Sequence, residues 1–304
     1  MKILAIDIGG TFIKYALMDE TAAVLSKGKE PTVPSREGEL ETIGCIFAAN
    51  RADCVALSMP GIIDVEKGYC IMGGGALPYN TGFAAGDAVS AVCGGVPVFV
   101  ENDAKCAAIA EAKAGSLQGA SSGFAIIIGT MVGGGYVING KLQKGAHFSA
   151  GEISYIMVDR NGYPNAGSVF GKTCSVNSLC RLFAELKGRL SATGEDVFDA
   201  MDAGDPDGMK ALDAYAYEIA VQIFSLQNIL DPERFAIGGG ISRRPELIES
   251  IRRALNRIYE NCPYPVPHAE VVQCRYFNDA NLMGAFCCAR EGLEKQAGNF
   301  EKSF

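Results

Sequence analysis

The first residues of the chain alternate between apolar runs and short polar breaks. An apolar, β-branched run over residues 3–8 ends at Gly9-Gly10-Thr11, and a second run over residues 12–18 ends at two acidic residues. Apolar stretches of this length with glycine between them are typical of β-strands joined by tight turns. A third short run follows over residues 22–26, so the sequence predicts a glycine-rich hairpin at the start of the chain.

The same pattern returns in the middle of the chain. An apolar run over residues 124–128 is followed by Gly129-Thr130, a triple glycine, and a second run that ends at Asn139-Gly140. This last dipeptide is favoured in two-residue hairpin turns. A further glycine cluster follows the apolar run over residues 234–237. We interpret the chain as internally duplicated at the level of structure.

Strands and helices alternate between these glycine-rich units. Short strands are predicted at residues 54–58 and 96–100. Helices are predicted over residues 104–114, 176–187, 194–203 and 206–230, and from residue 245 onward. Asp205 is the expected cap of the helix that begins at Pro206. The alternation predicts an α/β fold.

Small and polar residues cluster at 115–122, where we place a boundary between two lobes. The first lobe is expected over residues 1–118 and the second over residues 119–289. The C-terminal helix, expected over residues 290–304, is a candidate to join the first lobe.

Composition and charge narrow the functional classes. The 304 residues carry a net charge of -8, which argues against nucleic acid or an anionic membrane surface as the main partner. Asp7 interrupts the first apolar run too early for a signal peptide, so we expect a cytoplasmic protein. None of the eleven cysteines are spaced C-x-x-C and only two histidines occur, so neither a disulfide framework nor a zinc site is expected.

The first glycine turn carries groups that suit a phosphate. Glycine lets backbone N–H groups approach an anion closely, while a hydroxyl, a carboxylate and an ammonium can hold its oxygens and a Mg²⁺ ion. Asp7, Gly9-Gly10-Thr11 and Lys14 supply all of these groups. One such turn is an ordinary hairpin; two of them, with a third glycine cluster, predict a nucleotide held between the lobes.

Six motifs together resemble the ROK family of sugar kinases and repressors, in order and spacing, over nearly the whole chain. They are Asp7-Ile-Gly-Gly-Thr-Phe-Ile-Lys14, Ser58-Met-Pro-Gly61, Glu101-Asn-Asp-Ala104, Gly129-Thr-Met-Val-Gly-Gly-Gly135, Ala150-Gly-Glu-Ile-Ser-Tyr155 and Ile237-Gly-Gly-Gly-Ile-Ser242. The resemblance implies the actin-like, ribonuclease-H-like ATPase fold: two lobes with ATP, and its Mg²⁺, in the interlobe cleft.

The resemblance also implies roles for individual residues. Asp103 looks like the general base that takes a proton from a sugar hydroxyl as it attacks the γ-phosphate, although an acidic residue in the first turn of a helix is also favoured by the helix dipole alone. The remaining expected contacts are Asp7, Gly9, Gly10, Thr11, Lys14, Gly129, Thr130 and Gly133 for phosphate and Mg²⁺, Gly238, Gly239 and Gly240 for adenosine, and Gly73, Gly74, Asn102 and Glu152, with Asp103 itself, for the sugar.

Departures from the family pattern bear on the acceptor. Tyr155 stands where zinc-containing members have a metal-binding histidine, and their cysteine-rich segment is reduced to residues 165–172. The nearest similar pattern is that of the β-glucoside kinase group, which shares the Met-Gly-Gly stretch at residues 72–74 and phosphorylates the 6-hydroxyl of the non-reducing glucose of cellobiose. Glucose and N-acetylmannosamine are the alternative acceptors. Tyr155, together with Tyr79 or Phe83, could face a second sugar ring; for each of them core packing is an equally weighted alternative.

Two further departures concern ATP use. Met131 replaces a usual glycine in the second hairpin, and Lys105 replaces a usual asparagine. We expect Lys105 to be solvated, with a phosphate contact as the alternative. The family also contains repressors, which carry a helix-turn-helix ahead of the ATPase-like domain; because Met1 is only six residues before Asp7, we expect none here. A catalytically silent sugar-binding regulator is the remaining alternative. The resemblance further implies a homodimer.

Overall fold

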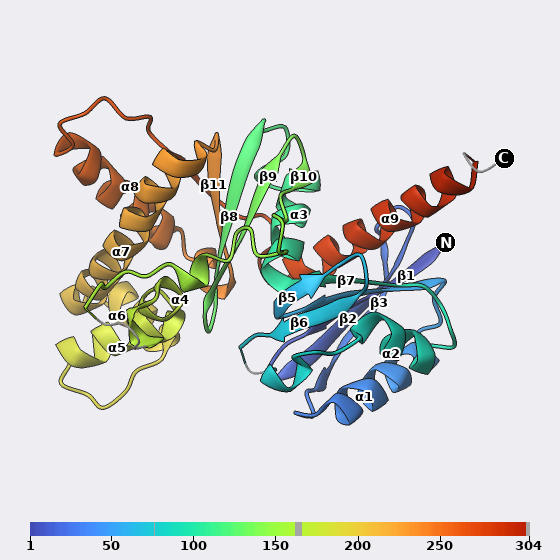
Figure 1. The fold of residues 1–304 in the computed structure, drawn as a ribbon. Coiled ribbons are helices and arrows are strands. Elements are labelled where there is room, and N and C mark those ends of the chain that lie inside the picture. The colour runs from blue at the N-terminus through green and yellow to red at the C-terminus, as the bar shows by residue number, and fades with distance from the viewer. Residues whose placement is uncertain (76, 162–165, 302–304) are drawn as a thin grey trace. The chain divides into compact units, whose positions relative to one another are not determined.

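The structure is a computed structural model that describes residues 1–75, 77–161 and 166–301 (Figure 1). Contacts divide the chain into two compact units. The first contains Met1–Lys113, Lys144–Ala150 and the chain from Asp279 onward, and the second contains Ala114–Gln143 and Gly151–Asn278. The predicted boundary after residue 118 lies a few residues later than this division, and the C-terminal helix belongs to the first unit from its beginning rather than from residue 290.

The first unit is built on a five-stranded sheet in the order β3-β2-β1-β4-β7. The strands are β1 (Lys2–Ile8), β2 (Phe12–Asp19), β3 (Val24–Pro31), β4 (Cys54–Met59) and β7 (Val98–Asn102). β1 is antiparallel to β2 and parallel to β4, and β4 is parallel to β7. A separate hairpin is formed by β5 (Gly61–Asp64) and β6 (Tyr69–Gly73).

Helices cover both faces of the first sheet. α1 (Arg36–Ala49) and α2 (Ala85–Val92) lie on one face, and α9 (Ala280–Glu301) packs on the other, against β1, β4 and β7 (Figure 1). α3 (Asp103–Ala114) follows β7 directly. The core joins the inward-facing residues of β1 and β4 to α1 and α2, among them Ile6, Leu57, Phe47 and Val89.

The second unit repeats this arrangement. Its sheet has the order β10-β9-β8-β11-β12, formed by β8 (Ser122–Ile128), β9 (Val132–Ile138), β10 (Lys141–Leu142), β11 (Arg234–Gly238) and β12 (Glu270–Gln273). β8 is antiparallel to β9 and parallel to β11, as β1 is to β2 and β4. The predicted duplication is therefore confirmed.

The helices of the second unit were largely expected from the sequence. They are α4 (Phe170–Thr173), α5 (Val176–Leu186), α6 (Gly194–Asp202), α7 (Pro206–Leu230) and α8 (Pro245–Glu260). Asp205 caps α7 as predicted, with its side chain accepting from the N–H of Asp207 at 3.0 Å. α7 and α8 pack together over a core that includes Phe124, Phe235 and Tyr215.

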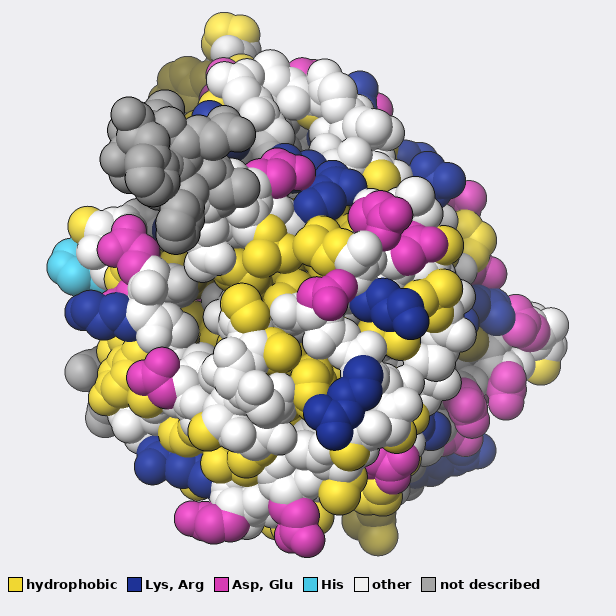
Figure 2. Space-filling view, turned by 90° about the vertical axis from the view of Figure 1, so that its right-hand side faces the viewer, with side chains coloured by type: hydrophobic (Ala, Val, Ile, Leu, Met, Phe, Trp, Pro, Cys, Tyr) yellow, Lys and Arg dark blue, Asp and Glu magenta, His cyan; other side chains and the backbone are white. Residues whose placement is uncertain are grey.

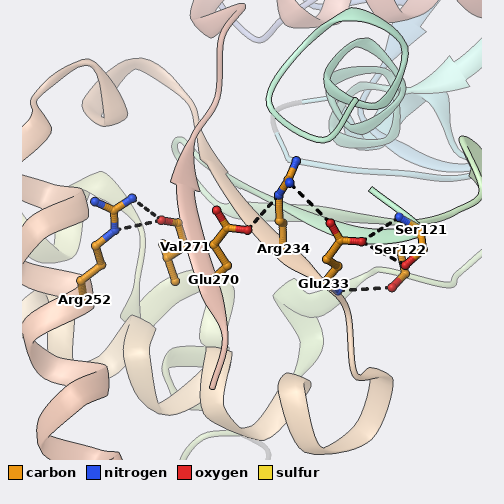
Figure 3. Close-up of polar contacts among 7 residues, drawn as sticks. All are labelled: Ser121, Ser122, Glu233, Arg234, Arg252, Glu270 and Val271. Carbon is orange, nitrogen blue, oxygen red and sulfur yellow. Dashed lines mark hydrogen bonds and ion pairs between the residues drawn. The ribbon is translucent and has the colours of Figure 1, made fainter. Parts of the chain in front are cut away.

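Polar contacts close the amino ends of the parallel strands in the second unit (Figure 3). Glu233 accepts hydrogen bonds from the N–H and hydroxyl of Ser121 at 2.9 and 3.1 Å. Next to it, Arg234 at the start of β11 pairs with Glu270 at the start of β12, 2.8 Å between Nε and Oε2. The glycine-rich turns lie at the opposite, carboxyl ends, where ligands usually bind in α/β sheets.

The surface mixes charges of both signs. On the face shown in Figure 2, the described Lys and Arg side chains alternate with Asp and Glu and with small apolar groups, without an extended basic patch. None of the described helices is long and apolar enough to cross a membrane.

Candidate functional site

A row of polar side chains crosses the first sheet near the carboxyl ends of its strands. Register pairs Lys14 with Asp7, Asp7 with Ser58, and Ser58 with Glu101, across β2, β1, β4 and β7. Asp7 is only 5% exposed. It accepts hydrogen bonds from the Ser58 hydroxyl at 2.8 Å and from the Asn281 amide at 3.0 Å, and Lys14 Nζ lies 4.0 Å from its other oxygen.

Burial dominates the electrostatics of Asp7. It raises the pKa of the carboxyl, although the hydrogen bonds from Asn281 and Ser58 and the charge of Lys14 act in the opposite direction. A buried carboxylate with incomplete compensation is stabilised by a nearby cation. Because Mg²⁺ in nucleotide sites needs only one or two carboxylates in addition to phosphate oxygens, Asp7 and the Thr11 hydroxyl fit such an ion.

The loop between β1 and β2 is held in one shape by Thr32. The Thr32 hydroxyl donates to the carbonyl of Gly9 at 2.6 Å, and its N–H donates to the carbonyl of Thr11 at 3.0 Å. The N–H of Gly9 also donates to the carbonyl of Phe12 at 3.0 Å, which closes the turn. Gly10 and Thr11 remain exposed. The predicted phosphate-binding residues therefore form a fixed, accessible turn beside Asp7.

The second hairpin and the third glycine cluster lie side by side in the second unit. Register pairs Gly238 with Ile127, so the turn after β11 runs next to the end of β8. Gly239 has φ +93°, and a Cβ at this position would collide with the carbonyl group of Ile128. Only glycine allows this approach. The structure thus brings Gly129 and Thr130 close to Gly238–Gly240, as a shared nucleotide site requires.

The side chain of Met131 fits beside Gly171 in α4. A Cβ on Gly171 in α4 would lie 2.8 Å from the Met131 methyl carbon and 2.6 Å from the Ser154 hydroxyl. The end of the Met131 side chain therefore packs against α4, in space that the missing side chain of Gly171 leaves. The hairpin keeps its turn, with Gly129 N–H donating to the carbonyl of Met131 at 2.8 Å.

Asn102 and Asp103 lie where β7 becomes α3. Asn102 caps the helix, since its Oδ1 accepts the N–H of Lys105 at 3.0 Å, and its amide donates to the carbonyl of Gly61 at 2.9 Å. Asp103 is the first residue of α3 and is half-buried. Its carboxylate therefore stands at a helix N-terminus, the position that favours an anion.

Gly73 and Gly74 lie beside Asn102. Register pairs Gly73 with Gly61, and a Cβ on Gly74 would be 3.0 Å from the Gly61 nitrogen. The amide of Asn102 binds the carbonyl of the same Gly61. Four of the expected sugar contacts, Gly73, Gly74, Asn102 and Asp103, are thus grouped in the first unit.

Glu152, the fifth expected sugar contact, belongs to the second unit and precedes a short 3-10 helix, Ile153–Tyr155. The Tyr155 side chain is 56% exposed, and burial of its remainder together with the Glu152 charge raises the pKa of its phenol. Tyr79 and Phe83 instead pack against the core of the first unit, and the Tyr79 hydroxyl donates to Glu39 at 2.5 Å. For these two residues the core-packing alternative holds.

Lys105 is not solvated, so that expectation is wrong. The side chain is 2% exposed and Nζ donates to the carbonyl of Phe148 at 2.7 Å. Within the described residues, no group of three or more His, Cys, Asp or Glu side chains could hold a metal ion. Part of the shortened segment at 165–172, namely Asn165, lies outside those residues.

Sequence reasoning assigned no role to Ser58, Asn281 and Thr32. Ser58 belongs to a quoted motif, and its contact with Asp7 follows from the parallel register of β1 and β4. Thr32 follows β3, and the antiparallel pairing of β2 and β3 brings it back to the turn at Gly9 and Thr11. No local sequence pattern indicates these contacts. Asn281 is brought to Asp7 only by the packing of α9.

Two sheets of the same order, each opened by a glycine hairpin and alternating with helices, are the actin-like ATPase fold. The sequence profile of the ROK family matches residues 3–291. The chain belongs to the ROK family.

Its relatives include sugar kinases. A β-glucoside kinase of Listeria innocua is 30% identical over 290 residues, which cover 94% of this chain and 96% of that protein. A ROK family protein from Streptococcus pneumoniae, solved in complex with sucrose, has a TM-score of 0.85 at 28% identity and covers 97% of this chain and 100% of its own. A ROK family glucokinase from Streptomyces griseus, solved with glucose and AMPPNP, has a TM-score of 0.81 at 26% identity. The match covers 94% of this chain and 98% of that chain.

Proposed function

We propose that this ROK family sugar kinase transfers the γ-phosphoryl group of ATP to the 6-hydroxyl of a glucosyl unit, with a β-glucoside such as cellobiose as acceptor. The observation that carries the proposal is the placement of Asp103 at the N-terminus of α3, next to Asn102, whose amide is fixed on Gly61. The similarity to a β-glucoside kinase over 94% of the chain supports the acceptor class.

In this proposal Asp103 is the general base. The 6-hydroxyl oxygen forms a bond to the γ-phosphorus while the bond from that phosphorus to the β,γ-bridging oxygen breaks, so that ADP leaves. The hydroxyl proton passes to the Asp103 carboxylate. Asn102, Glu152 and the backbone at Gly73 and Gly74 hold the ring hydroxyls and orient the 6-hydroxyl, which supplies the positioning that this chemistry chiefly needs.

The glycine turns are the proposed contacts for ATP. In the first unit, the N–H groups of Gly9-Gly10-Thr11 and the Lys14 ammonium bind phosphate oxygens. In the second unit, Gly129, Thr130 and Gly133 bind phosphate, and the glycines at 238–240 give the adenosine close access to the backbone. Asp7 and Thr11 would hold Mg²⁺, which when bound neutralises charge on the phosphates.

Tyr155 supports an acceptor longer than one ring. Tyr155 is 56% exposed and follows Glu152 by three residues, so its large apolar ring is available to pack against a second sugar ring. A silent regulator is a weaker alternative, because the Asp103 carboxylate, the Thr11 turn and the Asp7 carboxylate are all retained, and Met131 packs against Gly171 without opening the second hairpin.

The test is the steady-state rate of phosphoryl transfer from ATP to cellobiose, glucose, N-acetylmannosamine and N-acetylglucosamine. The proposal expects the highest kcat/KM for cellobiose. A strong preference for free glucose or for an N-acetylated hexosamine would overturn the β-glucoside assignment and leave the kinase intact. Absence of transfer to all four sugars, with sugar binding retained, would instead support the regulator.

We also propose that the protein is a homodimer, as the resemblance to the family implies. Light scattering coupled to size exclusion should then give twice the 32.1 kDa of one chain. A monomeric mass would contradict this.

A further inference from the structure

Two charged residues flank Asn102 and Asp103, and both are almost completely buried. Glu101 and Lys105 are each 2% exposed. Burying a charge is costly unless it is paired or hydrogen-bonded, so the partners of these two side chains matter. Each of the two is bonded to the same short piece of chain, Lys144–Ala150.

Two tethers connect this segment to the helix start. Lys144 Nζ pairs with Glu101 Oε2 at 2.7 Å, and Lys105 Nζ donates to the carbonyl of Phe148 at 2.7 Å. Lys144–Ala150 belongs to the first unit, as do Glu101 and Lys105, although the residues before and after the segment belong to the second.

The segment is a closed loop with a costly backbone conformation. The N–H of Ala150 donates to the carbonyl of Lys144 at 3.1 Å, which closes the loop on itself. Phe148 has φ +58°, a left-handed conformation that a bulky residue adopts only when its surroundings impose it. Its carbonyl is the group that Lys105 binds, so the lysine stabilises this conformation directly.

The two residues that hold the segment also contact a candidate sugar-binding residue, Asn102. The backbone N–H of Lys105 donates to Asn102 Oδ1 at 3.0 Å, and Glu101 Oε1 accepts the N–H of Asn102 at 3.0 Å. The two residues that contact Asn102 therefore also hold Lys144–Ala150 within the first unit.

We propose that Lys105 is a positioning residue for the acceptor sugar. With the Glu101–Lys144 pair, it fixes Lys144–Ala150 beside Asn102 and Asp103. It is not a contact for the phosphates of ATP, because the side chain is buried and donates to the carbonyl of Phe148. This inference rests on the proposed function. It assigns to the lysine that replaces the usual asparagine a role in acceptor binding.

Lys105→Met tests the proposal, since it keeps the length of the side chain and removes the ammonium. The KM for the acceptor should rise about ten-fold or more, while the KM for ATP changes less than about two-fold. Hydrogen exchange measured by mass spectrometry should show faster exchange over residues 146–150 in the protein without substrates. Lys113→Met is the matched control: Lys113 lies on the same helix, pairs with Glu291 on α9, and should leave both KM values and the exchange unchanged.

The outcomes separate this inference from the proposed function. If Lys105→Met raises only the KM for ATP, Lys105 is a phosphate contact and the inference is overturned. The inference is also overturned if the variant changes neither the acceptor KM nor the hydrogen exchange at residues 146–150. If the parent protein transfers phosphate to no sugar, the proposed function fails, and the exchange measurement still decides whether Lys105 fixes the segment. If Lys105→Met does not fold, Lys144→Gln loosens the other tether; it should raise the acceptor KM and the exchange at residues 146–150, and no change in either would overturn the inference.

Discussion

The Ser58 hydroxyl donates a hydrogen bond of 2.8 Å to the Asp7 carboxylate, directly across the parallel pair β1 and β4. This bond, and the one from Asn281, only partly compensate for the burial of Asp7, whose pKa is raised. A group with a raised pKa in the folded protein binds its proton more tightly there than in the unfolded chain. Its contribution to stability is present at low pH and is lost as the pH rises through its folded pKa.

Asp7→Asn should therefore raise the melting temperature at pH 7 in the absence of nucleotide and metal, because the variant no longer buries an ionised carboxylate. The difference from the parent should shrink as the pH falls toward the ordinary aspartate value of about 4. Kinase activity should be lost, since the amide is a poor ligand for Mg²⁺. Calorimetric melting at several pH values checks the first point, and a variant less stable than the parent at pH 7 would contradict it.

Asp103→Asn should preserve folding and sugar binding and lower kcat by about two to four orders of magnitude, because the amide keeps the shape and cannot accept the proton. Asp87→Asn is the matched control, since Asp87 is an exposed carboxylate in the first turn of α2. Turnover by Asp103→Asn close to that of the parent would remove Asp103 from its proposed role.

Tyr155→Ala should lower kcat/KM for cellobiose by about three- to ten-fold and leave the value for glucose nearly unchanged, because only the longer acceptor has a second ring to stack. Tyr217→Ala, at a comparably exposed tyrosine on α7, provides the control. Equal losses for both sugars would show that Tyr155 does not distinguish a second ring.

Gly284→Ala should destabilise the first unit strongly. A Cβ at Gly284 on α9 would collide with the backbone carbonyl of Cys106 on α3, and backbone cannot move aside cheaply. By contrast, a Cβ at Gly44 on α1 would lie 3.7 Å from the nearest atoms of Val92, an ordinary van der Waals distance. Gly44→Ala should therefore stabilise the protein by about 0.5–1 kcal/mol through the better helix propensity of alanine. Urea unfolding of the two variants compares them, and a stabilising Gly284→Ala would refute the close helix contact.

The sequence predicts those parts of the fold whose signals are local. Both glycine hairpins, the turn at Asn139-Gly140 and the start of α7 at Asp205-Pro206 depend on residues adjacent in the chain, and all of them are confirmed. Asn139 and Gly140 have φ values of 50° and 70°, as a type I′ turn requires.

Elements without such local signals were not predicted. α1 contains Gly38 and Gly44, which interrupt a helical pattern, and α2 is short and packs through Gly86 against Gly68. Helices of this kind depend on tertiary packing more than on their own propensity.

The same distinction applies to the candidate site. The residues in glycine turns and at the start of α3 follow from motifs, whereas the burial of Lys105 depends on the carbonyl of Phe148, far along the chain. The contact of Asn281 with Asp7 joins the two ends of the sequence. Only the completed fold establishes these contacts.

The return of α9 to the first sheet has a consequence for biosynthesis. The second unit has all its residues once Asn278 has left the ribosome, but the first unit, although translated earlier, still lacks the helix that covers β1, β4 and β7. Until then the apolar face of that sheet is open to water and to chaperones, and Asp7 lacks the amide of Asn281. The first unit, although most of it is translated first, therefore cannot complete its fold before α9 has been synthesised.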